Sequence, residues 1–131
     1  MAKRELWKEQ PDDHDYPAAQ SFLSMLATPD LAEELAGRLR EAPVEHFLAK
    51  DLLRAARLAP LGPDNVHVAG DLKKVKKGRP LSPVLLVRGR MDADIPLVVA
   101  DGYHRICASY HLDEDASIPC RLVDLRPGRA R

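Results

Sequence analysis

The sequence predicts a small α/β (α+β) domain in which a mixed β-sheet follows an N-terminal helical hairpin. The chain has 131 residues, which is the size of one ordinary domain. Apolar residues make up 45% of it, enough to build a hydrophobic core. In the second part of the chain, short apolar runs and helical patterns follow one another in the order strand, helix, strand, strand, helix, strand. We therefore divide the chain into residues 1–43, an arm with a helical hairpin, and residues 44–131, an α/β domain.

The first sixteen residues are charged and are interrupted by Pro11, so we expect a solvated arm. His14 lies among aspartates in this arm, a composition that can bind a metal ion. Adjacent residues of an extended chain point to opposite sides, however, and we therefore predict no metal site there.

Two helices follow the arm. The first is expected over residues 17–26, with Pro17 in its first turn. Its apolar side chains are Phe22, Leu23 and Leu26. The second is expected over residues 31–40, with Thr28 as its cap and Pro29 at its start. Its apolar stripe consists of Leu31, Leu35 and Leu39. Together they predict a helical hairpin whose role is structural.

From Pro43 onward the periodicity changes. We expect a strand within residues 47–54 and a loop over residues 58–64, which contain two prolines and a glycine. A helix then runs from Asp64 or Asn65, either of which can cap it, to about Lys77. Its inward-facing residues are expected to be Val66, Val68, Leu72 and Val75.

The remaining elements form the end of the domain. The apolar runs at residues 82–88 and 95–100 predict two strands joined by a turn over residues 89–94. A helix is expected from about residue 103 to residue 112, and a last strand over residues 118–123.

Charge, cysteines and apolar runs exclude several classes of protein. The formal net charge is zero, so no overall field attracts the molecule to nucleic acid or to an acidic membrane. Residues 1–50 are net acidic by four charges and residues 51–131 net basic by four, which favours the second half for an anion site. Cys107 and Cys120 form no CxxC pair, so we predict small buried thiols. No signal peptide or membrane span is recognisable, and a cytoplasmic protein is expected.

The most informative stretch is Asp101-Gly102-Tyr103-His104-Arg105, where a predicted strand passes through a glycine into a helix. Backbone amides at the start of a helix lack partners and carry partial positive charge. His104 and Arg105 add donors in the first turn, and arginine suits a bidentate contact with phosphate oxygens. The pattern predicts a site for an anion, most simply a phosphate, although such turns also occur in purely structural roles.

This stretch resembles the signature of the ParB/sulfiredoxin superfamily, in which a Gly-x-His-Arg or Gly-Glu-Arg-Arg turn binds nucleotide phosphates. The run Gly78-Arg-Pro-Leu-Ser-Pro-Val-Leu-Leu-Val87 is similar to the family's strand in which a proline precedes a hydrophobic run. Residues 102–112 and 118–123 are similar to its helix and closing strand. The resemblance covers residues 45–125 and implies a ParB/sulfiredoxin-like fold.

The resemblance also implies a ligand, namely a nucleotide (ATP or CTP) with or without Mg²⁺. The nucleotide-binding residues that it implies are Gly102, Tyr103, His104 and Arg105. In sulfiredoxins the preceding helix carries a lysine near the phosphates toward its start; this chain has no lysine there, and His67 and Lys73 are the candidates on that helix, with a capping histidine and a solvated helix end as the alternatives. Asp101 matches a catalytic aspartate of the free-serine kinases in this superfamily, where it could orient a hydroxyl, act as a base or hold Mg²⁺. An aspartate that merely shapes the turn fits the sequence equally well. Whether nucleotide hydrolysis or phosphotransfer follows binding stays open.

Two departures from the family limit what is implied. Sulfiredoxins carry their catalytic cysteine at the position of Tyr103, so sulfinic-acid reduction is not expected. Chromosome-partition ParB proteins continue into a helix-turn-helix module, for which this chain leaves no room, so sequence-specific DNA binding is not expected either.

Two other functions remain as alternatives. The N-terminal helices, through Phe22, Leu26, Leu31 and Leu35, could dock a protein partner or a second copy in a regulatory module without catalysis. A nonspecific DNA-binding or nuclease accessory protein could use basic residues 73–79 and 126–131 as a local patch.

Overall fold

The computed structural model describes residues 6–126 and shows a small α+β fold. A mixed sheet is combined with five α-helices and a short 3₁₀ turn in this part of the chain. The elements in chain order are α1 (Asp15–Leu23), α2 (Pro29–Glu41), β1 (Val44–Leu48), α3 (Ala49–Ala56), α4 (Val66–Lys76), β2 (Val84–Val87), η1 (Met91–Ala93), β3 (Val98–Asp101), α5 (Tyr103–Leu112) and β4 (Ser117–Val123).

The four strands lie in the order β1-β4-β2-β3, so the last strand occupies the middle of the sheet. β2 and β4 are parallel, whereas the β1–β4 and β2–β3 pairs are antiparallel. The predicted mixed sheet is therefore confirmed. The pairing of β2 with β3 places Asp101, the last residue of β3, opposite Leu85 in the middle of β2.

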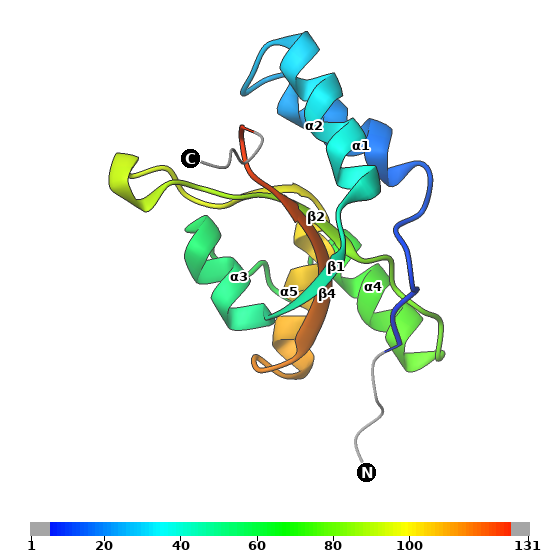
Figure 1. Ribbon diagram of the computed structural model, residues 1–131. Coiled ribbons are helices and arrows are strands. Elements are labelled where there is room, and N and C mark those ends of the chain that lie inside the picture. Colours follow the sequence, from blue (N-terminus) through cyan, green and yellow to red (C-terminus); the bar gives the residue numbers. More distant parts are fainter. Residues whose placement is uncertain (1–5, 127–131) are drawn as a thin grey trace.

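The sheet is covered on both faces, as Figure 1 shows. Leu85 and Val87 of β2 pack with Tyr16, Leu35 and Leu39 of the hairpin formed by α1 and α2. Alternate β2 residues face the other way, toward a core that contains these side chains of α3, α4 and α5: Leu52, Leu53, Val68, Ile106 and Cys107. This alternation follows from the pleat of a strand. The N-terminal hairpin and the α/β domain therefore share a hydrophobic core.

The N-terminal segment differs from the predicted solvated arm. The Leu81 amide donates to the Leu6 carbonyl at 2.9 Å and the Lys8 amide donates to the Leu81 carbonyl at 2.8 Å, so residues 6–8 run along the entry to β2. Asp15 is only 3% exposed and Tyr16 5%, because both begin α1 and face the sheet. The prediction of a solvated arm is wrong at these positions. The first five residues of the predicted arm lie outside the described part.

The hairpin helices are close to their prediction, with shifted ends. α1 begins two residues before Pro17 and ends at Leu23. Of its predicted apolar side chains, Leu23 is buried, whereas Phe22 and Leu26 are exposed, as is Met25. The cap of α2 is confirmed, since the Thr28 hydroxyl accepts the Leu31 amide hydrogen.

The predicted strand within residues 47–54 is largely wrong. The strand is Val44–Leu48, and the chain turns directly into α3 at Ala49. The buried residues of α3 recur at helical spacing: Ala49, Leu52, Leu53 and Ala56. This spacing is a helix signal in the sequence, and the preceding apolar strand masks it because the two elements have no loop between them.

The later elements follow their prediction more closely. Asn65 caps α4 by accepting the amide hydrogens of His67 and Val68, and α5 has the predicted bounds. Val66, which is predicted to face inward, is exposed because it precedes the buried face of α4. The strand expected at residues 95–100 instead covers Val98–Asp101, after η1 and an Arg90–Ile95 bridge. None of the helices within residues 6–126 is both long and apolar enough to cross a membrane.

Candidate functional site at the start of helix α5

The corner between β3 and α5 has the geometry that the sequence predicts. β3 ends at Asp101, Gly102 adopts a φ of +115°, and α5 begins at Tyr103. The first helical hydrogen bond runs from the Ile106 amide to the Gly102 carbonyl at 3.0 Å. Gly102 provides no side-chain cap, so the amides of residues 103–105 precede the helical ladder. This arrangement concentrates partial positive charge at the corner.

Gly102 is required by the packing of the fold itself. A Cβ at this position would lie 2.4 Å from Cγ1 of Val84 and 3.0 Å from Nη2 of Arg105. The space that a side chain would occupy is therefore filled by β2 and α5. That Gly102 lets a ligand approach the backbone closely stays a prediction.

A cavity of about 220 Å³ opens at the corner. It is lined by residues of the β3–α5 turn and of one face of α4: His67, Asp71, Asp101, Gly102, His104 and Arg105. All of them except Asp71 are predicted site residues. The cavity does not include Lys73, which is exposed near the end of α4, or Tyr103, whose hydroxyl donates to the Ala59 carbonyl.

Asp71 is a lining residue that the sequence analysis missed. It lies one helical turn after His67, so both side chains share the face of α4 that meets α5. Its side chain is 13% exposed, and burial raises the pKa of its carboxyl, against the effect of Lys74 and Arg105. The i, i+4 spacing from His67 is the sequence signal that could have identified it.

Arg105 is held by groups of the protein itself. Its Nη2 donates to Asp101 Oδ2 at 3.1 Å and to the Pro83 carbonyl at 3.3 Å, and it lies 3.9 Å from Asp15 Oδ2. The side chain is 17% exposed, and its buried Nε has no hydrogen-bond partner in the described part of the molecule. Arg105 therefore links α1, the residue before β2, the end of β3 and α5 at the corner.

The remaining polar groups of the corner are perturbed mainly by burial. Burial raises the pKa of Asp101. The positive charge of Arg105 partly offsets this rise, and the nearby carboxylate of Asp15 adds to it. Burial also lowers the pKa of His104, with a smaller effect from His67. The His67 and His104 rings are tilted against each other with centroids 4.6 Å apart. The corner thus combines two imidazoles with carboxylates and one paired guanidinium.

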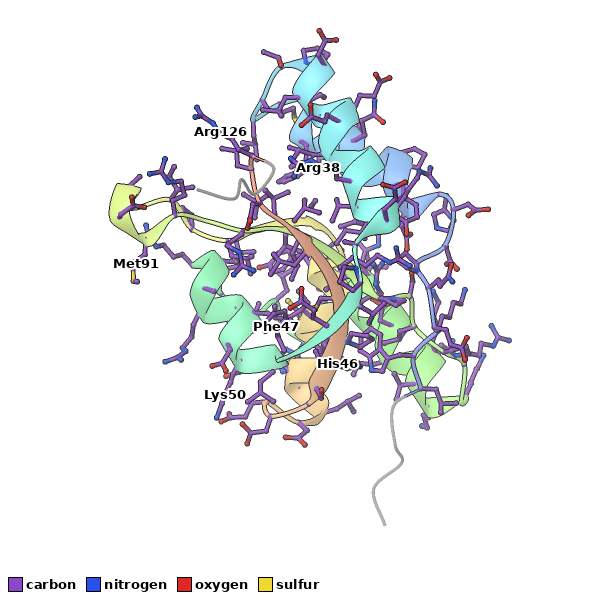
Figure 2. All side chains as sticks on the ribbon, viewed as in Figure 1. Arg38, His46, Phe47, Lys50, Met91 and Arg126 are labelled. Carbon is purple, nitrogen blue, oxygen red and sulfur yellow. The ribbon has the colours of Figure 1, made fainter. Side chains whose placement is uncertain are left out.

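Two further features do not line the corner cavity. The ligand atoms of Asp12, His14 and Asp15 lie within 4.8 Å of one another, the only such trio among residues 6–126, although the sequence predicts no metal site there. A larger apolar cavity of about 490 Å³ lies between α3 and residues 88–97. No predicted site residue lines it. Figure 2 shows Met91 projecting outward from η1, and this residue is 97% exposed.

Both cysteines are buried, as predicted. Cys107 accepts a hydrogen bond from the Leu61 amide at 3.4 Å, and burial raises its pKa. Burial raises the pKa of Cys120 to about 12. These thiols are poor candidates for nucleophiles because the reactive form is the thiolate.

No family model matches this chain, and the searches of curated proteins and of solved structures give no match either. The structural class of the protein is that of its fold, a small α+β domain with a mixed sheet that is covered on both faces.

Proposed function

We propose that this protein binds the phosphate groups of a nucleotide at the β3–α5 corner. The observation that carries the proposal is the start of α5: amides that precede the helical ladder open beside a polar cavity lined by His104 and Arg105. Helix starts of this kind bind phosphates in many proteins. The resemblance of residues 101–105 to the ParB/sulfiredoxin turn supports the same ligand.

The size of the cavity limits how much of the ligand enters it. Sites for whole ligands usually have volumes of about 300–1,000 Å³. The corner has about 220 Å³. It therefore suits the phosphates, while the base and sugar lie outside, and it gives no basis for choosing between ATP and CTP.

The charges of the corner require a cation to accompany the phosphate. Arg105 is already compensated by Asp101 and Asp15, and Asp71 adds a further carboxylate. Lys74 adds a positive charge beside Asp71, so three carboxylates face two cations and an additional anion meets net negative charge. Mg²⁺ prefers carboxylate and phosphate oxygens, and Asp101 and Asp71 offer such oxygens. We accordingly expect nucleotide binding that depends on a divalent cation.

The test is calorimetric titration of the protein with ATP, CTP, GTP and ADP, each with and without Mg²⁺. His104→Ala is expected to weaken binding by about tenfold, the usual order for the loss of a charge-assisted or well-placed hydrogen bond. Arg105→Ala is included with a thermal-unfolding control because that residue also holds the corner together. Absence of binding to all four nucleotides, or equal binding by both variants, would refute the proposal.

A second function is favoured by exposed apolar side chains at the end of the hairpin. Phe22, Met25 and Leu26 are 39%, 75% and 62% exposed, although Leu35, which is predicted on the same surface, is buried against the sheet. We propose this patch as the contact for a second copy of the chain. Light scattering over a range of protein concentrations tests it. Leu26→Ser should shift a dimer to monomer, whereas a monomer at all concentrations would exclude it.

A further inference from the structure

The corner cavity holds a second set of groups with a chemistry of its own. His67 and Asp71 project from adjacent turns of α4, and His104 projects from the first turn of α5, which packs against α4. Two imidazoles and a carboxylate are the side chains that transition metals prefer among nitrogen and oxygen ligands. We propose that His67, Asp71 and His104 form a binding site for a divalent transition-metal ion of the zinc type.

The spacing of the two imidazoles fits this role. Two histidines that share a zinc ion at about 2.1 Å have ring centres about 5 Å apart. The His67 and His104 centroids are 4.6 Å apart and the rings are tilted by 44°. The ligand atoms of His67, Asp71 and His104 are not all within 4.8 Å of one another, so the proposed site requires the side chains to rotate on binding. Exposure of His67 and half-burial of His104 at the cavity wall leave room for that rotation.

The carboxylate of Asp71 is available to a ligand. Its contact in the described part of the chain is with Lys74 Nζ at 3.9 Å, which is too long for a hydrogen bond. The Lys74 side chain is 55% exposed and can turn into solvent. Asp71 is therefore a partly buried carboxylate without a strong internal donor, at the edge of the cavity that His67 and His104 line.

The positive charge of Arg105 does not oppose a cation there. Asp101 Oδ2 lies 3.1 Å and Asp15 Oδ2 3.9 Å from its Nη2, so two carboxylates face one guanidinium. With Lys74 counted beside Asp71, the corner holds two cations and three carboxylates, so a metal ion bound by Asp71 would enter a net negative surrounding. This site depends on side chains of α4 and α5 alone, and it does not require the cavity to bind a phosphate.

The trio Asp12, His14 and Asp15 is closer together but is engaged with protein donors. Lys8 Nζ lies 2.6 Å from Asp12 Oδ1. Asp15 Oδ2 accepts hydrogen bonds from the Ser82 hydroxyl and the Asp12 amide. A metal ion at this trio would have to displace those donors, so we place the ion at the corner and use the trio as the control.

The experiment titrates tag-free protein, freed of metal by a chelator, with Co²⁺ in the absence of nucleotide. We expect stoichiometric binding with visible d–d absorption bands and displacement of Co²⁺ by Zn²⁺. His104→Ala and Asp71→Asn are each expected to weaken binding by at least about tenfold, since even outer-shell partners of metal sites contribute that much. Excess Mg²⁺ is not expected to displace Co²⁺, because Mg²⁺ prefers oxygen ligands.

The matched control is His14→Ala, which removes the histidine of the other trio and should leave Co²⁺ binding unchanged. Thermal unfolding of each metal-free variant separates a lost ligand from a lost fold. Absence of Co²⁺ binding, loss of binding in His14→Ala but not in His104→Ala, or ready displacement by Mg²⁺ would each overturn the proposal. Because no nucleotide is present, the result is independent of whether the corner binds phosphate.

Discussion

Gly102 occupies a backbone conformation with a φ of +115°, and Val84 fills the space beside its Cα. Replacement by alanine imposes backbone strain of about 1–3 kcal/mol. It also forces the new methyl group against β2, at a cost of about 1–3 kcal/mol. We therefore expect Gly102→Ala to lower the free energy of unfolding by at least about 2 kcal/mol, measured by urea denaturation.

Gly37 offers a matched control because it lies within α2 and a Cβ added to it would meet nothing within 4 Å. Gly37→Ala should raise the free energy of unfolding by about 0.5–1 kcal/mol, since alanine loses less conformational freedom in a helix. If the two alanine variants changed stability in the same direction, the packing described at Gly102 would be wrong.

The two cysteines give a prediction about pH and reactivity. Burial raises the pKa of Cys120 to about 12 from an ordinary value of 9.0 and raises that of Cys107 as well. The fold favours the neutral thiols, so their contribution to stability is complete below pH 9 and is lost as the pH rises from 9 toward 12. We expect neither cysteine to react with iodoacetamide at neutral pH in the native protein, and both to react in urea. Rapid modification of the native protein would contradict this burial.

At the scale of elements, the segment before α1 acts as a strap that joins the hairpin to β2 and α5. The strap leads into Asp15, the first residue of α1, whose carboxylate accepts hydrogen bonds from the Ser82 hydroxyl and the Asp12 amide and lies near Arg105. Asp15→Ala removes the acceptor of the Ser82 hydroxyl and one of the two acceptors of the Asp12 amide, so we expect a loss of about 1–3 kcal/mol in the free energy of unfolding.

Asp13 supplies the comparison for that prediction, because it is an exposed carboxylate two residues away. Asp13→Ala should change the stability by no more than about 0.5 kcal/mol. Equal midpoints of urea denaturation for the two variants would show that the strap contributes nothing to the fold.

The elements differ in how well their sequences predict them. α2 and α5 are predicted well because each has a clear start signal, Thr28-Pro29 in one and a glycine after a strand in the other. α3 escapes prediction because β1 passes into it without a turn residue, and an eight-residue helix offers few repeats of its apolar spacing. Local sequence signals therefore predict the bounds of an element only where a capping or turn residue marks its boundary.

At the scale of the whole molecule, contacts between distant segments explain what the sequence did not reveal. Predicted residues 101–105 form the corner because they are contiguous, and His67 reaches it because α4 packs against α5. Asp15 reaches Arg105, far from it in the chain, only through the packing of the hairpin on the sheet. One sequence signal for that packing exists: all four residues of β2 are apolar and buried, the pattern of a strand covered on both faces.

The shared core leads to a prediction about the division of the chain at residue 43. Removing residues 1–43 would expose Leu85, Val87 and Ala100, which the hairpin covers. We expect the remaining chain to lose cooperative thermal unfolding and to bind the dye ANS, as proteins with exposed cores do. Within the full chain, Leu35→Ala should cost about 2–5 kcal/mol as a buried substitution, whereas exposed Leu26→Ala should change stability by no more than about 0.5 kcal/mol. Cooperative unfolding of residues 44–131 with the stability of the full chain would show instead that the hairpin is a separate unit, because a strand face that needs its cover cannot lose it without a measurable change.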